Sequence, residues 1–232
     1  MKHAIEYGPS FAWLRINLAP GETIEAEAGA MVTKTPDLGM STHLNAGNKA
    51  GFFGKVMAIL VALARKVFGG ETMFINRFGG AHGGEVLLAP SLSGPIWHRR
   101  MQAGQRSLLV QAGSYLASTG NIETKMRWAG LRGLFGGEGL FFLESQGDGD
   151  LFINSYGGIQ EIDVEGGYIV DTGHIVAFES SLDFKIKGAG QGLKSLFLSG
   201  EGLVCEFSGR GKLYIQSRNL GALVGWLSPF LR

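Results

Sequence analysis

Alternation of apolar and polar positions is the main pattern along this chain. Residues 182–188 (LDFKIKG) place Leu182, Phe184 and Ile186 on one side and charged residues on the other, as in a half-buried strand. Segments rich in β-branched, aromatic and leucine residues predict further strands at 106–117, 139–143, 151–154, 168–178 and 213–217. Many short strands between glycine turns predict an all-β protein, built as a sandwich or a barrel-like roll.

An eleven-residue string occurs three times and divides the chain into similar parts. The copies are FGGETMFINRF (68–78), FGGEGLFFLES (135–145) and LSGEGLVCEFS (198–208), and they align Glu71, Glu138 and Glu201. Glycine landmarks recur in the same order, at Gly29, Gly113 and Gly173 and again at Gly84, Gly149 and Gly211. We therefore expect a single domain of three repeats (about 1–105, 106–166 and 167–219), with three sheets around a pseudo-threefold axis and a tail at 220–232.

The first repeat carries an apolar insertion. From the second landmark glycine to the shared glutamate it has 42 residues, against 25 and 28 in the other repeats. The extra residues coincide with 51–70 (GFFGKVMAILVALARKVFGG), whose helical spacing predicts a short helix. Its uncharged run, 56–64, is shorter than the roughly 20 residues that span a bilayer. The helix could lie in the core, at a subunit contact or in a membrane interface. The expected contact residues are Phe52, Phe53, Val56, Ile59, Leu60, Leu63 and Val67.

The C-terminal tail is apolar as well. Residues 220–232 (LGALVGWLSPFLR) contain a single charge, at Arg232, and include Trp226 and Phe230. Chain ends usually fray unless they are tied down. The tail is expected to dock on a partner subunit or to insert shallowly into lipid, where tryptophan is enriched at the interface.

Composition and charge narrow the function classes. The formal net charge is +1, and no clustered basic face supports nucleic-acid binding; Arg99 and Arg100 are interpreted as a solvated edge. The single cysteine, Cys205, cannot form an internal disulfide and is expected to be a buried apolar residue. The N-terminus shows no apolar signal core, so a cytoplasmic location is expected, with peripheral contact at the inner face of the membrane as an option.

The histidines and the loop motifs do not predict chemistry. The five histidines lack metal-ligand spacing, and His174 is interpreted as turn filler, since the other repeats have Ala30 and Ser114 there. The string GAGQGLKS (188–195) departs from a phosphate-binding loop because a leucine separates the last glycine from the lysine. Asp148 and Asp150 favour a tight hairpin turn over a calcium loop.

The three shared glutamates are the remaining candidates for chemistry. Glu71, Glu138 and Glu201 could meet near the pseudo-axis and bind a cation, although capping of turns through backbone N–H groups is favoured. No catalytic residue and no cofactor are predicted, which favours a non-enzymatic protein over an enzyme.

The repeats resemble a known family. The segments EAEAGAMV (25–32), FGGEGLFF (135–142), GYIVDTGHIVAFE (167–179) and LSGEGLVCEFSGRGKLYIQSRN (198–219) resemble the bacterial family once called domain of unknown function 124, which is related to altered-inheritance-of-mitochondria (Aim-type) proteins. The resemblance covers nearly the whole chain and implies a fold similar to the double-stranded β-helix, or jelly roll, of the tryptophan RNA-binding attenuation protein class. It also implies higher oligomers, and the mitochondrial relatives are associated with inner-membrane organisation. It supplies no catalytic residues.

Two functional hypotheses follow. The first is a non-enzymatic, homo-oligomeric scaffold or binding module with a protein or membrane-surface partner. The alternative is a β-roll that binds a small ligand or a metal, with enzymatic activity left open; nucleic acid is not an expected partner.

Overall fold

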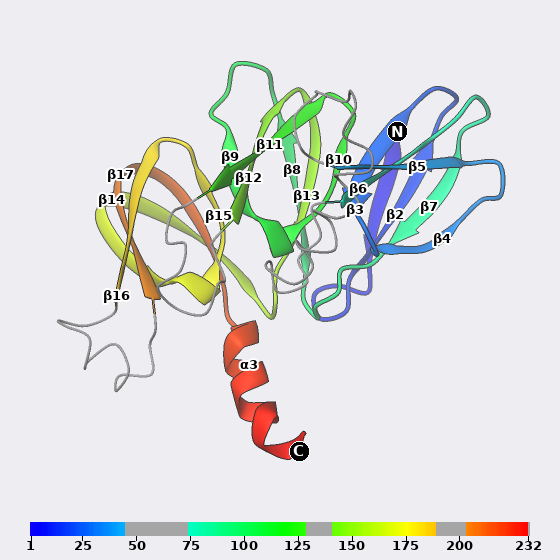
Figure 1. Cartoon of the computed structure of the whole chain (residues 1–232). Coiled ribbons are helices and arrows are strands. Elements are labelled where there is room, and N and C mark those ends of the chain that lie inside the picture. The colour runs from blue at the N-terminus through cyan, green and yellow to red at the C-terminus, as the bar shows by residue number, and fades with distance from the viewer. Residues whose placement is uncertain (45–73, 129–140, 189–202, 232) are drawn as a thin grey trace, which may run out of the picture.

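The computed structural model describes residues 1–44, 74–128, 141–188 and 203–231 (Figure 1). Within these residues the chain forms antiparallel strands, one short α-helix and three 3₁₀ turns. The strands are β1 (Lys2–Glu6), β2 (Trp13–Leu18), β3 (Thr23–Glu27), β4 (Met31–Lys34), β5 (Gly39–Leu44), β6 (Phe74–Gly79), β7 (Gly84–Leu88), β8 (Ile96–Met101), β9 (Leu108–Gln111), β10 (Tyr115–Thr119), β11 (Ile122–Trp128), β12 (Phe141–Gly147), β13 (Gly149–Asn154), β14 (Ile159–Asp171), β15 (Ile175–Glu179), β16 (Leu182–Gly188) and β17 (Leu203–Gln216). The remaining elements are η1 (Ala112–Ser114), η2 (Thr172–His174), α3 (Leu220–Leu227) and η3 (Ser228–Phe230).

The strands form three antiparallel sheets that lie in a row (Figure 1). The first sheet has the order β1-β2-β7-β4, and the middle sheet has the order β5-β6-β3-β10-β13-β8. The last sheet has the order β11-β12-β9-β15-β17-β14, and β16 also pairs with β17. The prediction of an all-β protein is confirmed, and the sheets are curled rather than flat.

Strand β16 shows how the alternating pattern works. Leu182 is buried, Phe184 and Ile186 are half-buried, and the charged residues between them are exposed. The strand pairs along its whole length with the first half of β17, from Leu182 opposite Gly209 to Gly188 opposite Leu203. The half-buried strand predicted for residues 182–188 is confirmed.

Two segments predicted as single strands are each broken by a 3₁₀ turn. Residues 106–117 divide into β9, η1 and β10, and residues 168–178 divide into the end of β14, η2 and β15. At η2 the carboxylate of Asp171 accepts a hydrogen bond from the N–H of Gly173 (2.7 Å). The apolar pattern continues across both turns, so it gave no sign of these corners.

The turn at Asp148 is a sheet corner and not a hairpin. Strand β12 pairs with β11 and β9, whereas β13 pairs with β10 and β8 in the middle sheet. The hairpin interpretation is therefore wrong. The chain leaves one sheet and enters the next across a single residue.

The last part of the chain has two long strands, β14 and β17, in place of such a change from one sheet to the next. Strand β14 pairs with β17 continuously from Ile159 opposite Gln216 to Asp171 opposite Val204. Gly166 and Gly209 face each other halfway along, with φ of 104° and 100°, a left-handed backbone conformation that glycine adopts without steric cost. This glycine pair occupies the middle of the ribbon.

Among the described residues, three apolar clusters form the core. One lies between the first and middle sheets and joins Ile16 to Leu116 and Phe152. A second lies between the middle and last sheets and includes Ile153 and Val176. The third lies within the last sheet. Its aromatic rings pack edge to face at centroid distances of 5.0–5.1 Å, and these contacts are Phe142–Phe178, Phe178–Phe184 and Phe178–Phe207. Burial of such large apolar groups, at about 1.5–3 kcal/mol each, is the main stabilising term.

Candidate functional site

The C-terminal helix is the most unusual surface feature. Helix α3 and the following turn η3 contain no buried residue. Trp226 is 66% exposed and Phe230 72% exposed, and their rings lie against each other at 5.6 Å between centroids. Residues 220–231 carry no charged side chain. A helix that is apolar on all sides is expected to be covered, so this segment is a candidate contact surface.

The first turn of α3 is fixed to the body of the protein. The side chain of Asn219 accepts a hydrogen bond from Ala222 N–H (3.2 Å) and donates one to the carboxylate of Asp171 (3.3 Å). A Cβ at position 173 would collide with the Asn219 side chain, so Gly173 is needed for this close approach. Asparagine before an apolar run is a known start signal for helices, and it could have located this start from the sequence.

A second group of hydrogen bonds supports the same root. The Gln216 side chain accepts from Tyr156 N–H (2.8 Å) and donates to the carbonyl of Gly173 (2.9 Å). The Nδ1 atom of His174 lies 2.7 Å from the carbonyl oxygen of Gln216. His174 thus lies in a turn, as expected, and also forms a hydrogen bond with the backbone of Gln216. The root of α3 is held by these hydrogen bonds, while the helix itself is exposed.

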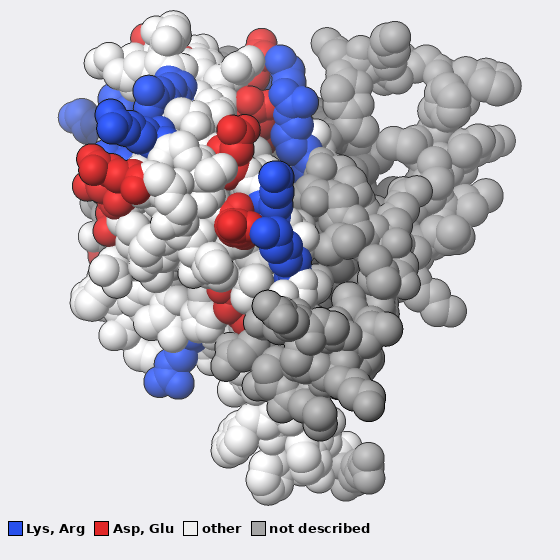
Figure 2. All heavy atoms as spheres, turned by 90° about the vertical axis from the view of Figure 1, so that its left-hand side faces the viewer, with Lys and Arg blue, Asp and Glu red and all other residues white. Residues whose placement is uncertain are grey.

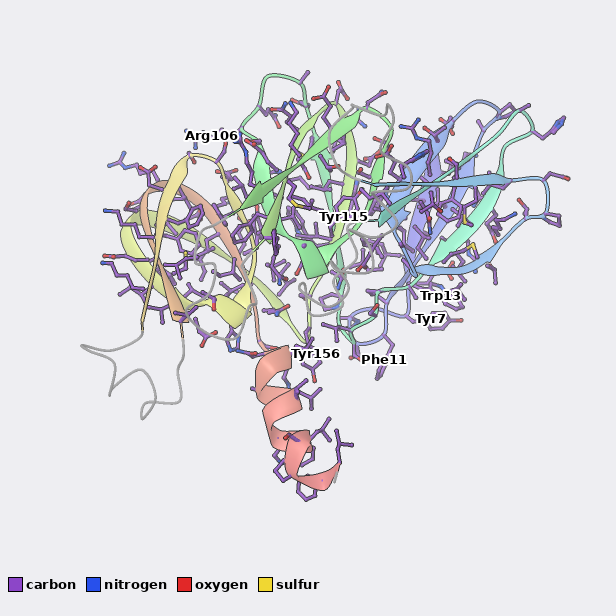
Figure 3. All side chains as sticks on the ribbon, in the orientation of Figure 1. Tyr7, Phe11, Trp13, Arg106, Tyr115 and Tyr156 are labelled. Carbon is purple, nitrogen blue, oxygen red and sulfur yellow. The ribbon has the colours of Figure 1, made fainter. Side chains whose placement is uncertain are left out.

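Other exposed aromatic side chains lie at the same end of the molecule. Tyr7 and Phe11 are both exposed, and the ring of Tyr7 packs edge-on against Trp13 at 4.9 Å. Figure 3 shows these three residues on the lower side of the body, the side from which α3 extends, with Tyr156 beside the root of the helix. This apolar end therefore has contributions from both termini of the chain.

Charged residues on the adjoining face are paired rather than clustered by sign. Figure 2 looks onto the end of the molecule that carries β14 and β17, and there Lys and Arg side chains lie next to Asp and Glu side chains. Lys212, for example, contacts both Glu161 and Asp163, and Lys187 contacts Glu206. The helix below this face shows no charged side chain (Figure 2).

The basic pair of β8 divides into two different environments. Arg99 is mostly buried and forms an ion pair with Glu179 (3.0 Å), which joins the middle and last sheets. Its guanidinium also lies 3.4 Å from the hydroxyl of Tyr214, and burial raises the pKa of that phenol. The prediction of a solvated edge is wrong for Arg99. Arg100 is more exposed and pairs with Asp148 and Asp150.

A histidine pair lies where β1 approaches β8. The rings of His3 and His98 meet edge to face at 4.5 Å, and His98 Nε2 lies 2.7 Å from Asp150 Oδ1. Burial, followed by the neighbouring His98, lowers the pKa of His3 below its ordinary value. His98 also stacks on Phe152. Within the described residues, no group of three or more His, Cys, Asp or Glu side chains is placed to hold a metal ion.

Cys205 lies in the core of the last sheet. It is fully buried beside Phe207, and burial raises the pKa of its thiol to about 12. A thiol in this environment stays protonated and unreactive. The interpretation of Cys205 as a small apolar core residue is confirmed.

Of the predicted contact residues, Trp226 and Phe230 are in the described part of the chain, and both are exposed on the C-terminal helix. The others lie outside it, as do the shared glutamates Glu71, Glu138 and Glu201. Those in the predicted inserted helix are Phe52, Phe53, Val56, Ile59, Leu60, Leu63 and Val67. Among the helices that the structure describes, none is long and apolar enough to cross a membrane.

The fold and the exposed helix define an all-β protein of curled antiparallel sheets with an apolar C-terminal appendage. A family profile described as mitochondrial biogenesis AIM24 matches residues 3–218, so the chain belongs to this family. An uncharacterised protein of Streptococcus pyogenes serotype M6 is 32% identical over 234 residues, covering 100% of this chain and 91% of the relative. A crystal structure of a Streptococcus pyogenes protein superposes with a TM-score of 0.79 at 31% identity, covering 99% of both chains.

Proposed function

We propose that this protein is a non-enzymatic scaffold module. In this proposal a β-body of three equivalent repeats assembles with further copies of itself and contacts the inner face of a membrane through its C-terminal helix. The observation that carries the proposal is the exposure of α3, an apolar helix tied at its root and covered by no described part of the chain.

Equivalent corner contacts support the three repeats. In each part of the chain, a side chain at or just after the end of one strand accepts a hydrogen bond from the backbone N–H of the residue directly after Gly84, Gly149 or Gly211. A Cβ added at Gly84 or Gly149 would collide with the accepting hydroxyl, which explains the landmark glycine directly before the donor. The three pairs are Thr35–Glu85 (3.2 Å), Thr119–Asp150 (3.1 Å) and Glu179–Lys212 (3.2 Å).

Strand pairing supports three similar parts, with boundaries before β8 (residue 96) and before β14 (residue 159) rather than at residues 105 and 166. In the first part β2 and β4 flank β7, while β3 and β5 flank β6. In the middle part β8 and β10 flank β13, while β9 and β11 flank β12. In the last part β14 and β17 each take the place of two strands, and β15 and β16 pair with β17. This common pattern is consistent with a double-stranded β-helix, or jelly roll, in each repeat.

Lipid is the partner that best suits the apolar end. The helix has eight residues, about 12 Å at 1.5 Å per residue, which suits shallow insertion rather than a span. It extends away from the body, and Tyr7 and Phe11 from a separate loop lie at the same end (Figures 1 and 3). Tryptophan and tyrosine prefer the membrane–water interface, because each has an apolar ring and a polar atom.

Flotation with lipid vesicles tests the lipid contact. The comparison uses the wild type, a Trp226→Glu/Phe230→Glu double variant and Met40→Glu, which places a single glutamate on an exposed apolar residue of β5. Wild type and Met40→Glu are expected to float with vesicles of neutral and anionic phospholipid, whereas the double variant stays at the bottom of the gradient. Absence of wild-type flotation would overturn the lipid contact. If only the oligomer mass changed in the double variant, the helix would instead dock on another copy.

A further inference from the structure

We propose that the two outermost strand edges of this chain pair with each other between copies, head to tail. Residues 168–171 of β14 in one copy would add antiparallel to β4 of the next copy. This inference rests on the equivalence of the three repeats proposed above. It deepens that proposal by assigning the strands and the register of self-assembly.

Two junctions inside the chain provide the template. At the first, β10 pairs antiparallel with β3, with Ala117 opposite Ala26 and Ser118 opposite Glu25. At the second, β15 pairs antiparallel with β9. The partners there are Ala177–Val110, Phe178–Leu109 and Glu179–Leu108. In each case, a strand that follows the landmark glycine of one part (Gly113 or Gly173) pairs with a strand that precedes the landmark glycine of the part before it (Gly29 or Gly113).

The equivalent strands at the two ends of the row of sheets, β4 and residues 168–171 of β14, lack such a neighbour among the described strands. Strand β4 follows Gly29, pairs with β7 on one side and forms the outer edge of the first sheet. Residues 168–171 precede Gly173, pair with β17 on one side and lie at the outer edge of the last sheet. Each of these two edges is therefore paired with a described strand on one side only, whereas the equivalent strands inside the chain are paired on both sides.

The register follows from the distance of each junction strand to its landmark glycine, and the paired strands beside it show the corresponding rows. Ala26 lies opposite Asn76, which lies opposite Thr42. Ala26, Val110 and Val170 are equivalent because each lies three residues before the second landmark glycine, which is Gly29, Gly113 or Gly173. Relative to the shared eleven-residue string, this alignment is shifted by one residue in the last part, because the string matches Asn76 and Leu143 with Glu206. The corresponding rows are Val110–Leu143–Met126 and Val170–Cys205–Ile186.

Exposure separates the end strands from their internal equivalents. Val32 is 48% exposed, whereas Leu116 and Val176 at the equivalent positions of β10 and β15 are fully buried. Tyr168 is 39% exposed, whereas Ile24 and Leu108 are 0% and 1% exposed. The same contrast holds for two further residues. Met31 is 38% exposed where Tyr115 and Ile175 are buried, and Ile169 is 64% exposed where Glu25 and Leu109 are half-buried.

The unpaired edges also leave backbone N–H and C=O groups available for a further ladder, which makes them templates for strand addition. Transfer of the internal register predicts the intermolecular partners Thr33–Val170, Lys34–Ile169 and Thr35–Tyr168. The row also brings the exposed Val32 to the junction.

The two edges cannot meet within one chain, because β4 and β14 lie at opposite ends of the row of sheets (Figure 1). Their pairing is therefore heterologous: one copy offers its first sheet and the next offers its last. Such an interface generates a ring if the rotation closes and an open fibre if it does not. In either case, a copy without neighbours has one free edge at β4 and one at residues 168–171 of β14.

Mixing of two edge variants tests this arrangement. Val32→Lys blocks the β4 edge, Ile169→Lys blocks the β14 edge, and Met40→Lys is the matched control on an exposed apolar residue of β5. Molar mass is measured by size-exclusion chromatography with light scattering. Wild type and the control are expected to form oligomers, each edge variant alone is expected to be monomeric, and an equimolar mixture is expected to give a dimer with one copy of each variant.

A monomeric wild type, or an equimolar mixture that stays monomeric, would overturn the proposal. Oligomers formed by both edge variants alone would overturn it as well, because assembly would then use another surface. Vesicle flotation of the monomeric variants separates the two proposals. Flotation by a monomer shows that lipid contact through α3 holds independently of assembly, and far-ultraviolet circular dichroism checks that both variants are folded.

Discussion

The internal junctions and the outer edges of this protein are built from the same kind of strand, yet they differ in what covers them. Leu116 on β10 and Val32 on β4 are both apolar, but the first is buried in the core between the first and middle sheets and the second is half exposed. Strand β10 also has β3 as a neighbour, whereas β4 has no second neighbour among the described strands. An outer edge is thus equivalent to one strand of an internal junction without the strand that pairs with it.

The two internal junctions also differ from each other in polar contacts. Between the middle and last sheets, Glu179 accepts from Arg99 and from Lys212 N–H, and Arg106 lies 3.7 Å away. At the equivalent positions Thr119 and Thr35 provide a hydroxyl and no ion pair. A carboxylate at this corner therefore bonds across the junction, while a threonine bonds within its own part of the chain.

The largest expected effect comes from equivalent truncations at an internal and an outer position. Leu116→Ala is expected to lower the free energy of unfolding by about 2–5 kcal/mol, because it leaves a cavity in the core between two sheets. Val32→Ala at the equivalent outer position is expected to change it by less than about 0.5 kcal/mol in dilute, monomeric protein. Urea unfolding measures both. Equal destabilisation by the two variants would contradict the contrast between junction and edge.

A smaller effect is expected from the ion pair at the second junction. Glu179→Ala removes the partner of the mostly buried Arg99 and is expected to cost about 1–3 kcal/mol of unfolding free energy. The control Glu123→Ala removes an exposed partner of Lys125 and is expected to cost less than about 0.5 kcal/mol. Thermal unfolding of the two variants is compared at the same pH. An effect of Glu179→Ala no larger than that of Glu123→Ala would contradict a stabilising role for the Arg99–Glu179 ion pair.

The smallest effect is a dependence of stability on pH near the β9 edge of the same junction. The hydroxyl of Ser107 and then the Arg127 guanidinium lower the pKa of Glu144 below its ordinary value. A lowered pKa stabilises the folded protein above the unfolded carboxyl's pKa, and this contribution is lost as the pH falls through the folded pKa. Ser107→Ala should therefore be more destabilising at neutral pH than below about pH 4. A difference that is independent of pH would contradict the assignment.

Sequence patterns predicted the class of fold and several strands, because burial on one face imposes alternation that can be read directly, as in β16. They did not predict the corners at η1 and η2, since residues 106–117 and 168–178 stay apolar through the change of direction. Corners depend on contacts between distant residues, such as the hydrogen bond from the Thr172 hydroxyl to the Leu203 carbonyl at η2. No local pattern contains these contacts.

The candidate surface was predictable in part. The apolar tail pointed to Trp226 and Phe230, and both are exposed. The role of Arg99 was missed, because its partner Glu179 is 80 residues away in sequence. The outer edges were missed for a related reason: Val32 and Ile169 lie in ordinary strand patterns, and their unusual exposure follows only from the order of strands in the sheets.

The most direct test of the central claim is a register-specific cross-link between copies. Two single variants, Lys34→Cys and Ile169→Cys, are mixed, oxidised and analysed by non-reducing electrophoresis; the native Cys205 is buried. The proposed register places positions 34 and 169 opposite each other, so a disulfide-linked heterodimer is expected. Thr33→Cys mixed with Ile169→Cys should give little product, since a slip of one residue turns the side chains to opposite faces. Absence of the first product, or equal yields from both mixtures, would contradict head-to-tail pairing of β4 with residues 168–171.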